Sequence, residues 1–62
     1  MCEANVYLRK AGKEELFMAQ VDKVVPLAEQ LMLQDVFGEK AYINAHIAEM
    51  ALVEHKIILQ EN

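Results

Sequence analysis

The combination of a short chain with a single cysteine constrains the fold most strongly. Sixty-two residues leave room for one domain, 1–62, and a chain of this length buries only about 60% of its unfolded surface. Small domains usually add disulfides, a metal or a second subunit. Because Cys2 is the only cysteine, an internal disulfide is excluded. The apolar share of 55% is high for this size, and we therefore expect a homodimer.

The charge and the size of the chain exclude several classes of function. Six basic and ten acidic residues give a net charge of −4, so the basic footprint that nucleic-acid binding requires is missing. No apolar run approaches the roughly 20 residues of a membrane-spanning helix, and the first residues lack the pattern of a signal peptide. We therefore expect a cytoplasmic protein with no nucleic-acid or membrane partner, in which a lone thiol stays reduced. The chain is also too small for an elaborate catalytic cleft, which favours binding or delivery over an enzyme.

Alternating hydrophobicity predicts a strand at the beginning of the chain. Ala4, Val6 and Leu8 alternate with polar residues, as is typical of a half-buried strand. Residues 10–13 include Gly12 and predict a turn with a positive φ. Residues 15–19 would return as a second strand and complete a hairpin.

The end of the chain alternates as well, from Val53 to Leu59, with His55 on the apolar side. Ile58 breaks this pattern because it is apolar and falls on the polar face. It predicts that this face is covered, for example by a partner subunit.

In the middle of the chain, residues 31–37 and 40–43 flank Gly38 and Glu39. Such a pair suits a two-residue type II′ hairpin loop. Taken together, these patterns predict an all-β fold, a small antiparallel β-sheet or barrel-like domain that is homodimeric.

Local propensity supports an alternative with helices. Residues 14–20 are rich in helix formers, and Pro26 stands where a helix prefers to begin, just before 27–31. Ile43, Ile47 and Met50 also lie at helical spacing. On propensity alone, the chain could be a helical hairpin between two terminal strands.

Three blocks of the sequence resemble the CooT family of small nickel-binding proteins. They are MCEANVYL at 1–8, VFGE at 36–39 and LVEHKIIL at 52–59. The resemblance implies a mainly antiparallel β fold, a symmetric dimer and a role in supplying Ni(II) to carbon monoxide dehydrogenase or its maturation machinery. It also implies that Cys2 is a nickel ligand. Residues 27–30 are more helix-like than the turn-rich linker typical of the family, a departure that touches the strand assignment and not Cys2.

The chemistry of Cys2 is compatible with this role. Its thiolate is a soft donor, and its sulfur and backbone nitrogen can close a five-membered chelate ring around a metal. Nitrogen and sulfur donors in one plane suit Ni(II) or Cu(II) better than tetrahedral Zn(II). One chain offers too few strong ligands for a closed site, and a two-fold axis between two Cys2 thiolates would complete four donors. Without the resemblance, the ordinary interpretation of Cys2 would be an inert thiol at a chain end.

The two histidines differ in their surroundings. His55 stands where a turn should lead into the last strand, and its imidazole could ligate nickel, in the Cys2 site or in a separate one. A merely solvated turn histidine is the alternative. His46 lies between apolar residues with no second ligand nearby in the sequence, so we expect a structural role for it.

The sequence thus predicts a nickel-binding accessory protein with Cys2 and His55 as metal ligands, and not an enzyme. Two rival functions remain open. One is a metal-free module that binds a protein partner through exposed sheet edges. The other is an RNA-binding β-barrel. Such a barrel needs a basic, aromatic face, and the chain has only four aromatic and six basic residues.

Overall fold

The computed structural model of the protein describes residues 3–62, and these form six strands and no helix. The strands are β1 (Ala4–Lys10), β2 (Lys13–Pro26), β3 (Leu31–Asp35), β4 (Lys40–Ile43), β5 (Ala45–Ala51) and β6 (Lys56–Glu61). They make one sheet in the order β4-β3-β2-β1-β6-β5. The all-β prediction is confirmed, and the helical alternative is wrong for every segment that suggested it.

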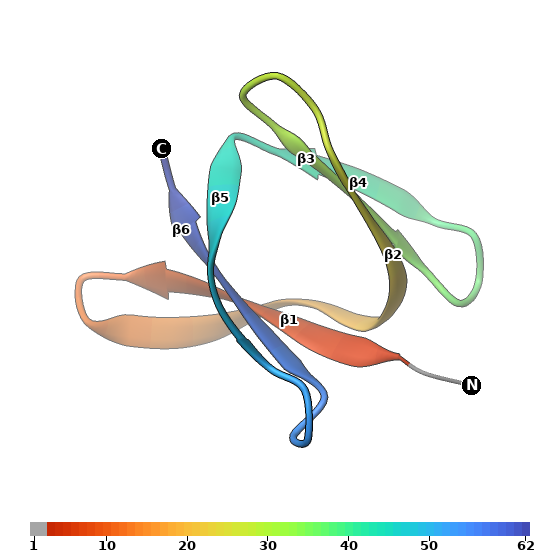
Figure 1. Cartoon of the computed structure of the whole chain (residues 1–62), viewed down its shortest axis with the longest axis horizontal. Coiled ribbons are helices and arrows are strands. Elements are labelled where there is room, and N and C mark those ends of the chain that lie inside the picture. The colour runs from red at the N-terminus through yellow and green to blue at the C-terminus, as the bar shows by residue number, and fades with distance from the viewer. Residues whose placement is uncertain (1–2) are drawn as a thin grey trace.

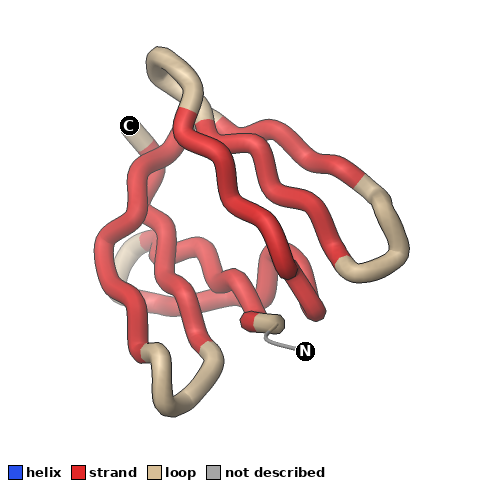
Figure 2. The backbone as a smooth tube through the Cα atoms, turned by 45° about the vertical axis from the view of Figure 1, so that its right-hand side comes forward, coloured by secondary structure: helices blue, strands red, loops and turns tan. Residues whose placement is uncertain are grey.

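The sheet is curled into a half-barrel (Figures 1 and 2). β4 and β5 stand at opposite ends of the strand order, yet Asn44 alone separates them in the chain. A flat sheet of six strands would hold these two edges far apart, since neighbouring strands lie about 4.8 Å from each other. The short connection is therefore possible only because the sheet bends round on itself.

The bend is made largely within β2, which was expected only over 15–19. This strand pairs with β1 up to Val21 and with β3 from Val21 onward, and both ladders have register shifts near that point. Gln20 has a positive φ of 56° there. Bulges of this kind bend a strand and increase its twist, and Figure 1 shows the resulting curve in β2.

The two hairpin loops differ in how well the sequence predicted them. Ala11 and Gly12 both have positive φ, as a two-residue type I′ turn requires, so the turn expected over 10–13 is confirmed. The loop between β3 and β4 is longer than the two-residue type II′ loop expected at Gly38 and Glu39. It runs over 36–39, and an Asp35 carboxylate oxygen accepts the backbone N–H groups of Phe37 and Glu39, each at 2.9 Å.

The C-terminal strand departs from the expectation in two ways. It begins at Lys56 and not at Val53, because residues 52–55 form the turn that follows β5. It also runs parallel to β1, with Asn5 opposite Lys56 and Arg9 opposite Gln60. The sheet is therefore mixed and not wholly antiparallel.

The core lies on the concave side of the curled sheet. Val6, Leu33 and Leu59 are its largest fully buried side chains. They come from β1, β3 and β6, so strands far apart in the sequence share one core. The other members are Leu8, Val21, Leu31 and Ala45, with Met18, Val24, Ile43 and Ile57 packed against them.

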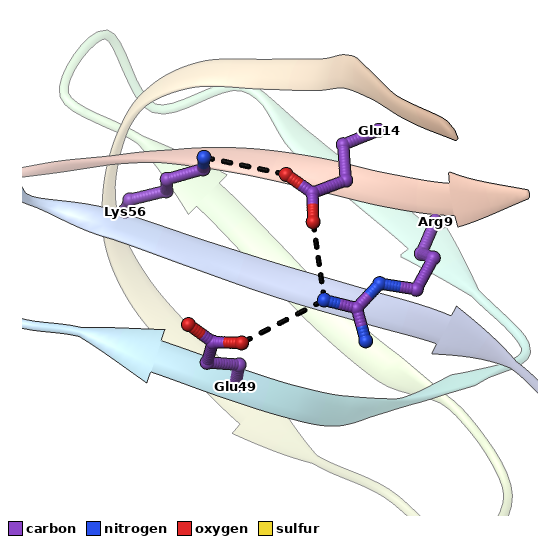
Figure 3. Close-up of polar contacts among 4 residues, drawn as sticks. All are labelled: Arg9, Glu14, Glu49 and Lys56. Carbon is purple, nitrogen blue, oxygen red and sulfur yellow. Dashed lines mark hydrogen bonds and ion pairs between the residues drawn. The ribbon is translucent and has the colours of Figure 1, made fainter. Parts of the chain in front are cut away.

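Ile58 is buried on the opposite, convex face, where only 3% of it is exposed. Its partners in the ladders are Tyr7 on β1 and Glu49 on β5. Arg9 on β1 pairs with Glu49 at 3.6 Å, and this contact passes over β6, which lies between the two strands (Figure 3). The expected cover over Ile58 is thus present within a single chain, without a partner subunit.

Glu14 extends this group of charges toward β2. It accepts a hydrogen bond from Arg9 at 3.1 Å and pairs with Lys56 at 3.3 Å (Figure 3). The Lys56 ammonium also lies over the Tyr7 ring, 5.1 Å from its centre. We call Arg9, Glu14, Glu49 and Lys56 the convex charge cluster. Its contacts with Arg9 first, and then with Lys56, hold the pKa of the Glu14 carboxyl below its ordinary value.

Truncating a core side chain should destabilise the fold strongly. Leu33→Ala removes a side chain that is fully buried, and such changes cost about 2–5 kcal/mol. We expect a much lower midpoint of unfolding in urea, measured at fixed protein concentration. Phe37→Ala is the control, because Phe37 is 75% exposed and should change the free energy of unfolding by less than about 0.5 kcal/mol. Equal losses in both variants would contradict this placement of the core.

The convex charge cluster should make stability depend on acidic pH. Because the pKa of Glu14 is lowered in the folded chain, its contribution is present above the ordinary glutamate pKa of about 4.3 and is lost as the pH falls through the folded value. Glu14→Gln should therefore lower the melting temperature at neutral pH but have little effect at about pH 3. Glu15→Gln is the control, because Glu15 lies one residue along the same strand and makes no ion pair within residues 3–62; it should lower the melting temperature at neutral pH less than Glu14→Gln does. A gap between wild type and Glu14→Gln that persists in acid would be the contrary result.

Candidate functional site

The turn between β5 and β6 fixes the position of His55. Its backbone N–H donates to the carbonyl of Leu52 at 3.2 Å, and the N–H of Glu54 donates to Ala51 at the same distance. His55 has a positive φ of 54°, a conformation in which histidine is found more often than most residues. The prediction that His55 stands in the turn before the last strand is confirmed.

Parallel pairing brings this turn to the beginning of β1. The backbone N–H of Asn5 donates to the carbonyl of His55 at 2.9 Å, and the ladder continues with Asn5 opposite Lys56. The first described residues of the chain and the β5–β6 turn are therefore neighbours. Cys2 lies outside the described residues, and it is bonded directly to Glu3 in the sequence.

A hollow of about 330 Å³ opens where the two segments meet. Glu3, His55 and Lys56 line it together with the apolar residues Val21, Leu52 and Ile57. His55 is exposed and Glu3 is half-buried. The hollow thus combines an apolar lining with a histidine and a glutamate, while the ammonium group of Lys56 pairs with Glu14 in the convex charge cluster. We call it the N-terminal hollow.

The residues that the structure describes do not by themselves form a metal site at the N-terminal hollow. Among residues 3–62, no three side chains of histidine, cysteine, aspartate or glutamate come close enough together to hold a metal ion. His55 and Glu3 supply two donor groups to the lining. Any closed metal site here requires donors from the residues before Glu3, from a second molecule or from both.

His46 lies in a different part of the fold. Its Nδ1 is 2.9 Å from the Oδ1 of Asn62, which fixes Nδ1 as the donor because a carbonyl oxygen can only accept. Asn62 also donates from Nδ2 to the carbonyl of Glu29 at 2.9 Å. His46 therefore joins β5 to the C-terminal residue and the β2–β3 loop, in agreement with the structural role expected for it.

Comparison with known proteins decides the family. The profile of the CO dehydrogenase accessory protein CooT matches residues 1–60. The chain belongs to the CooT family. A crystal structure of a protein provisionally identified as CooT from Carboxydothermus hydrogenoformans has 41% sequence identity and a TM-score of 0.92, with 98% of each chain covered. A comparison with curated proteins finds no match.

Membership of the CooT family confirms the resemblance seen in the sequence. It identifies the chain as an accessory protein of CO dehydrogenase and not as a catalytic enzyme, as the sequence predicted. The search for membrane-spanning helices found none among residues 3–62.

Sequence reasoning missed Glu3 and the apolar lining of the N-terminal hollow. Glu3 is an ordinary polar residue of an alternating strand in the sequence, and Leu52 lies just before the alternation that begins at Val53. The β5–β6 turn brings Leu52 next to His55, and only the parallel pairing of β1 with β6 brings Glu3 there. Val21, Leu52 and Ile57 are spread over the sequence, so no local pattern could have grouped them.

The positive φ of His55 gives the first test of this geometry. The left-handed conformation costs most residues about 1–2 kcal/mol, and asparagine tolerates it best among those with a side chain. His55→Asn should therefore retain wild-type stability, whereas His55→Val should lower the free energy of unfolding by about that amount. Thermal unfolding followed by circular dichroism measures both. If the two variants were equally stable, the turn would not have the backbone conformation described here.

Proposed function

We propose that this CooT family member carries Ni(II) as cargo and supplies it during the maturation of CO dehydrogenase. The proposed ligands are the Cys2 thiolate with its backbone nitrogen, and the imidazole of His55. One observation carries the proposal: Glu3, the residue bonded to Cys2, lines the same hollow as His55. Neighbouring Cα atoms in a chain are about 3.8 Å apart, so a site shared by Cys2 and His55 is within reach of the chain.

The donor chemistry supports nickel as the cargo. Thiolate, imidazole and backbone nitrogen are donors that suit borderline metals with planar coordination. Both the thiol and the imidazole must lose a proton to coordinate, so binding should weaken as the pH falls. An exposed imidazole beside the hollow also favours delivery, because a client protein must reach the ion in order to exchange ligands.

We further propose that a homodimer completes the site. The two donor groups that residues 3–62 bring to the hollow are too few to close a metal site, and a two-fold axis would double every donor. The side chains beside the hollow support a contact with a second surface, since Leu52 is 74% exposed and Val53 is 94% exposed. A second copy placed there would cover these apolar groups and bring two Cys2 residues together.

Nickel binding can be measured by titrating the reduced protein with Ni(II) at neutral pH. Ultraviolet-visible absorption would report a thiolate-to-nickel charge-transfer band, and native mass spectrometry would report the mass and the number of ions bound. We expect Cys2→Ser to abolish the band. His55→Asn should weaken binding about tenfold or more, equivalent to about 1.4 kcal/mol, because the backbone of the turn is preserved while the imidazole is lost.

His46→Asn is the matched control for the loss of an imidazole elsewhere in the fold, and it should bind nickel like the wild type. Wild-type affinity in Cys2→Ser would disprove the proposed site. Wild-type affinity in His55→Asn would remove His55 alone from the ligand set. If the wild type showed neither the charge-transfer band nor the added mass of nickel, the proposal that it carries Ni(II) would be wrong.

A further inference from the structure

The convex face of β2, β3 and β4 presents two ordered rows of side chains. In the ladders, Lys23 lies opposite Gln34, which lies opposite Lys40. In the next outward row, Val25, Met32 and Tyr42 are opposite one another in the same way. Residues paired across strands project from the same face of a sheet. We call these six residues the lysine-tyrosine face.

The opposite side of these strands belongs to the core, which fixes the direction of the rows. Leu33 lies between the two rows on β3, and it is fully buried. Since side chains alternate along a strand, Met32 and Gln34 must point away from the core. On this outward face the two lysines are exposed, and Tyr42 is 57% exposed.

Lys23 and Lys40 have no ion-pair partner within residues 3–62, and neither has Lys13 at the β1–β2 hairpin, which has no apolar row beside it in the ladders. The other three basic residues each pair with a glutamate. Asp35, at the end of β3 nearest the lysine row, already accepts two backbone N–H groups of its own loop. A chain with a net charge of −4 thus displays two unpaired ammonium groups beside an apolar row.

From this arrangement we infer that the lysine-tyrosine face docks an acidic, partly apolar surface of a protein partner. The inference rests on the proposed function, from which it takes CO dehydrogenase, the enzyme that the family serves, as the partner. Two adjacent strand spacings place the Lys23 and Lys40 backbones about 10 Å apart. They can therefore each meet one carboxylate of a partner, while Met32 and Tyr42 meet an apolar side chain between or beside them.

The composition of the lysine-tyrosine face favours a protein partner over a nucleic acid or an anionic membrane. A nucleic acid or an anionic membrane would meet only two lysines here, and the net charge of −4 would repel either of them. An apolar row next to a charged row matches the mixed composition of a protein surface. Six residues make a small patch, and small interfaces are typical of transient complexes, which suits a carrier that must leave after delivery.

Binding of the full-length protein to purified CO dehydrogenase tests this docking surface, for example by biolayer interferometry. Lys23→Glu and Lys40→Glu should each raise the Kd about tenfold, which corresponds to about 1.4 kcal/mol. Lys13→Glu makes the same change in net charge at the β1–β2 hairpin and should alter the Kd by less than about twofold. Tyr42→Ser should weaken binding without any change in charge, and added salt should weaken binding of the wild type.

Several outcomes would overturn the inference, and they are separable from a failure of nickel binding. Equal weakening by Lys13→Glu would mean that net charge alone acts. A change in native mass in Lys23→Glu or Lys40→Glu would make the face a contact between copies of this chain. A third outcome is that the wild type binds phosphatidylserine vesicles or single-stranded RNA more tightly than CO dehydrogenase and loses that binding in Lys23→Glu and Lys40→Glu. That result would show that the face binds a membrane or a nucleic acid and not a protein. If the enzyme did not bind at all, the docking surface would be wrong, while the nickel titration of Cys2→Ser would still decide the cargo.

Discussion

The single residue between β4 and β5 is the constraint on which the rest of this structure depends. Asn44 alone joins the two strands that form opposite edges of the sheet, so the sheet must curl. The C-terminal residue helps to hold the edges in place. The backbone N–H of Asn62 donates to the carbonyl of Asn44 at 3.2 Å, and its side chain reaches Glu29 in the β2–β3 loop. The curl allows so short a chain to form a hydrophobic core, because the concave face encloses Val6, Leu33 and Leu59.

The direction of β6 then determines where the candidate metal ligands lie. Because β6 runs parallel to β1, both strands begin at the same end of the sheet, and the turn before β6 meets Glu3 and Asn5. Antiparallel pairing of the same two strands would have placed His55 beside the end of β1, near Lys10. The N-terminal hollow is therefore a product of strand direction as much as of residue type. The bond from Asn5 to the His55 carbonyl marks this meeting point.

How much of the fold could be predicted depended on whether a strand keeps its alternation. In β1, Val6 and Leu8 alternate without interruption, and the strand was predicted almost to its ends. In β5, the register shifts between Ile47 and Glu49, which puts one extra residue into the strand. That insertion changes the phase of the alternation, so the spacing from Ile47 to Met50 resembles that of a helix. The bulge at Gln20 hid the second half of β2 for the same reason.

The candidate site was predictable in part. The sequence predicted a turn leading into the last strand at His55, but the alternation from Val53 also put His55 inside that strand, and the structure has only the turn at this position. It could not give the direction in which β6 pairs, since the hydrogen-bonding partner of a strand leaves no local pattern. The convex charge cluster and the lysine-tyrosine face could not be predicted from the sequence either. Ile58 predicted a cover, but the cover is the convex charge cluster of the same chain, whose members come from four strands.

The convex charge cluster and the lysine-tyrosine face differ in a way that bears on the proposed role as a nickel carrier. Over β1 and β6 the charges pair with one another and shield Ile58, so this surface is satisfied within the chain. On the lysine-tyrosine face, Lys23 and Lys40 find no such partner in residues 3–62. An acidic chain approaches an acidic partner favourably only in orientations that present its exposed positive groups. Two unpaired lysines beside an apolar row would therefore select the orientation of docking, and the turn that holds His55 would remain a separate surface for the proposed exchange of the ion.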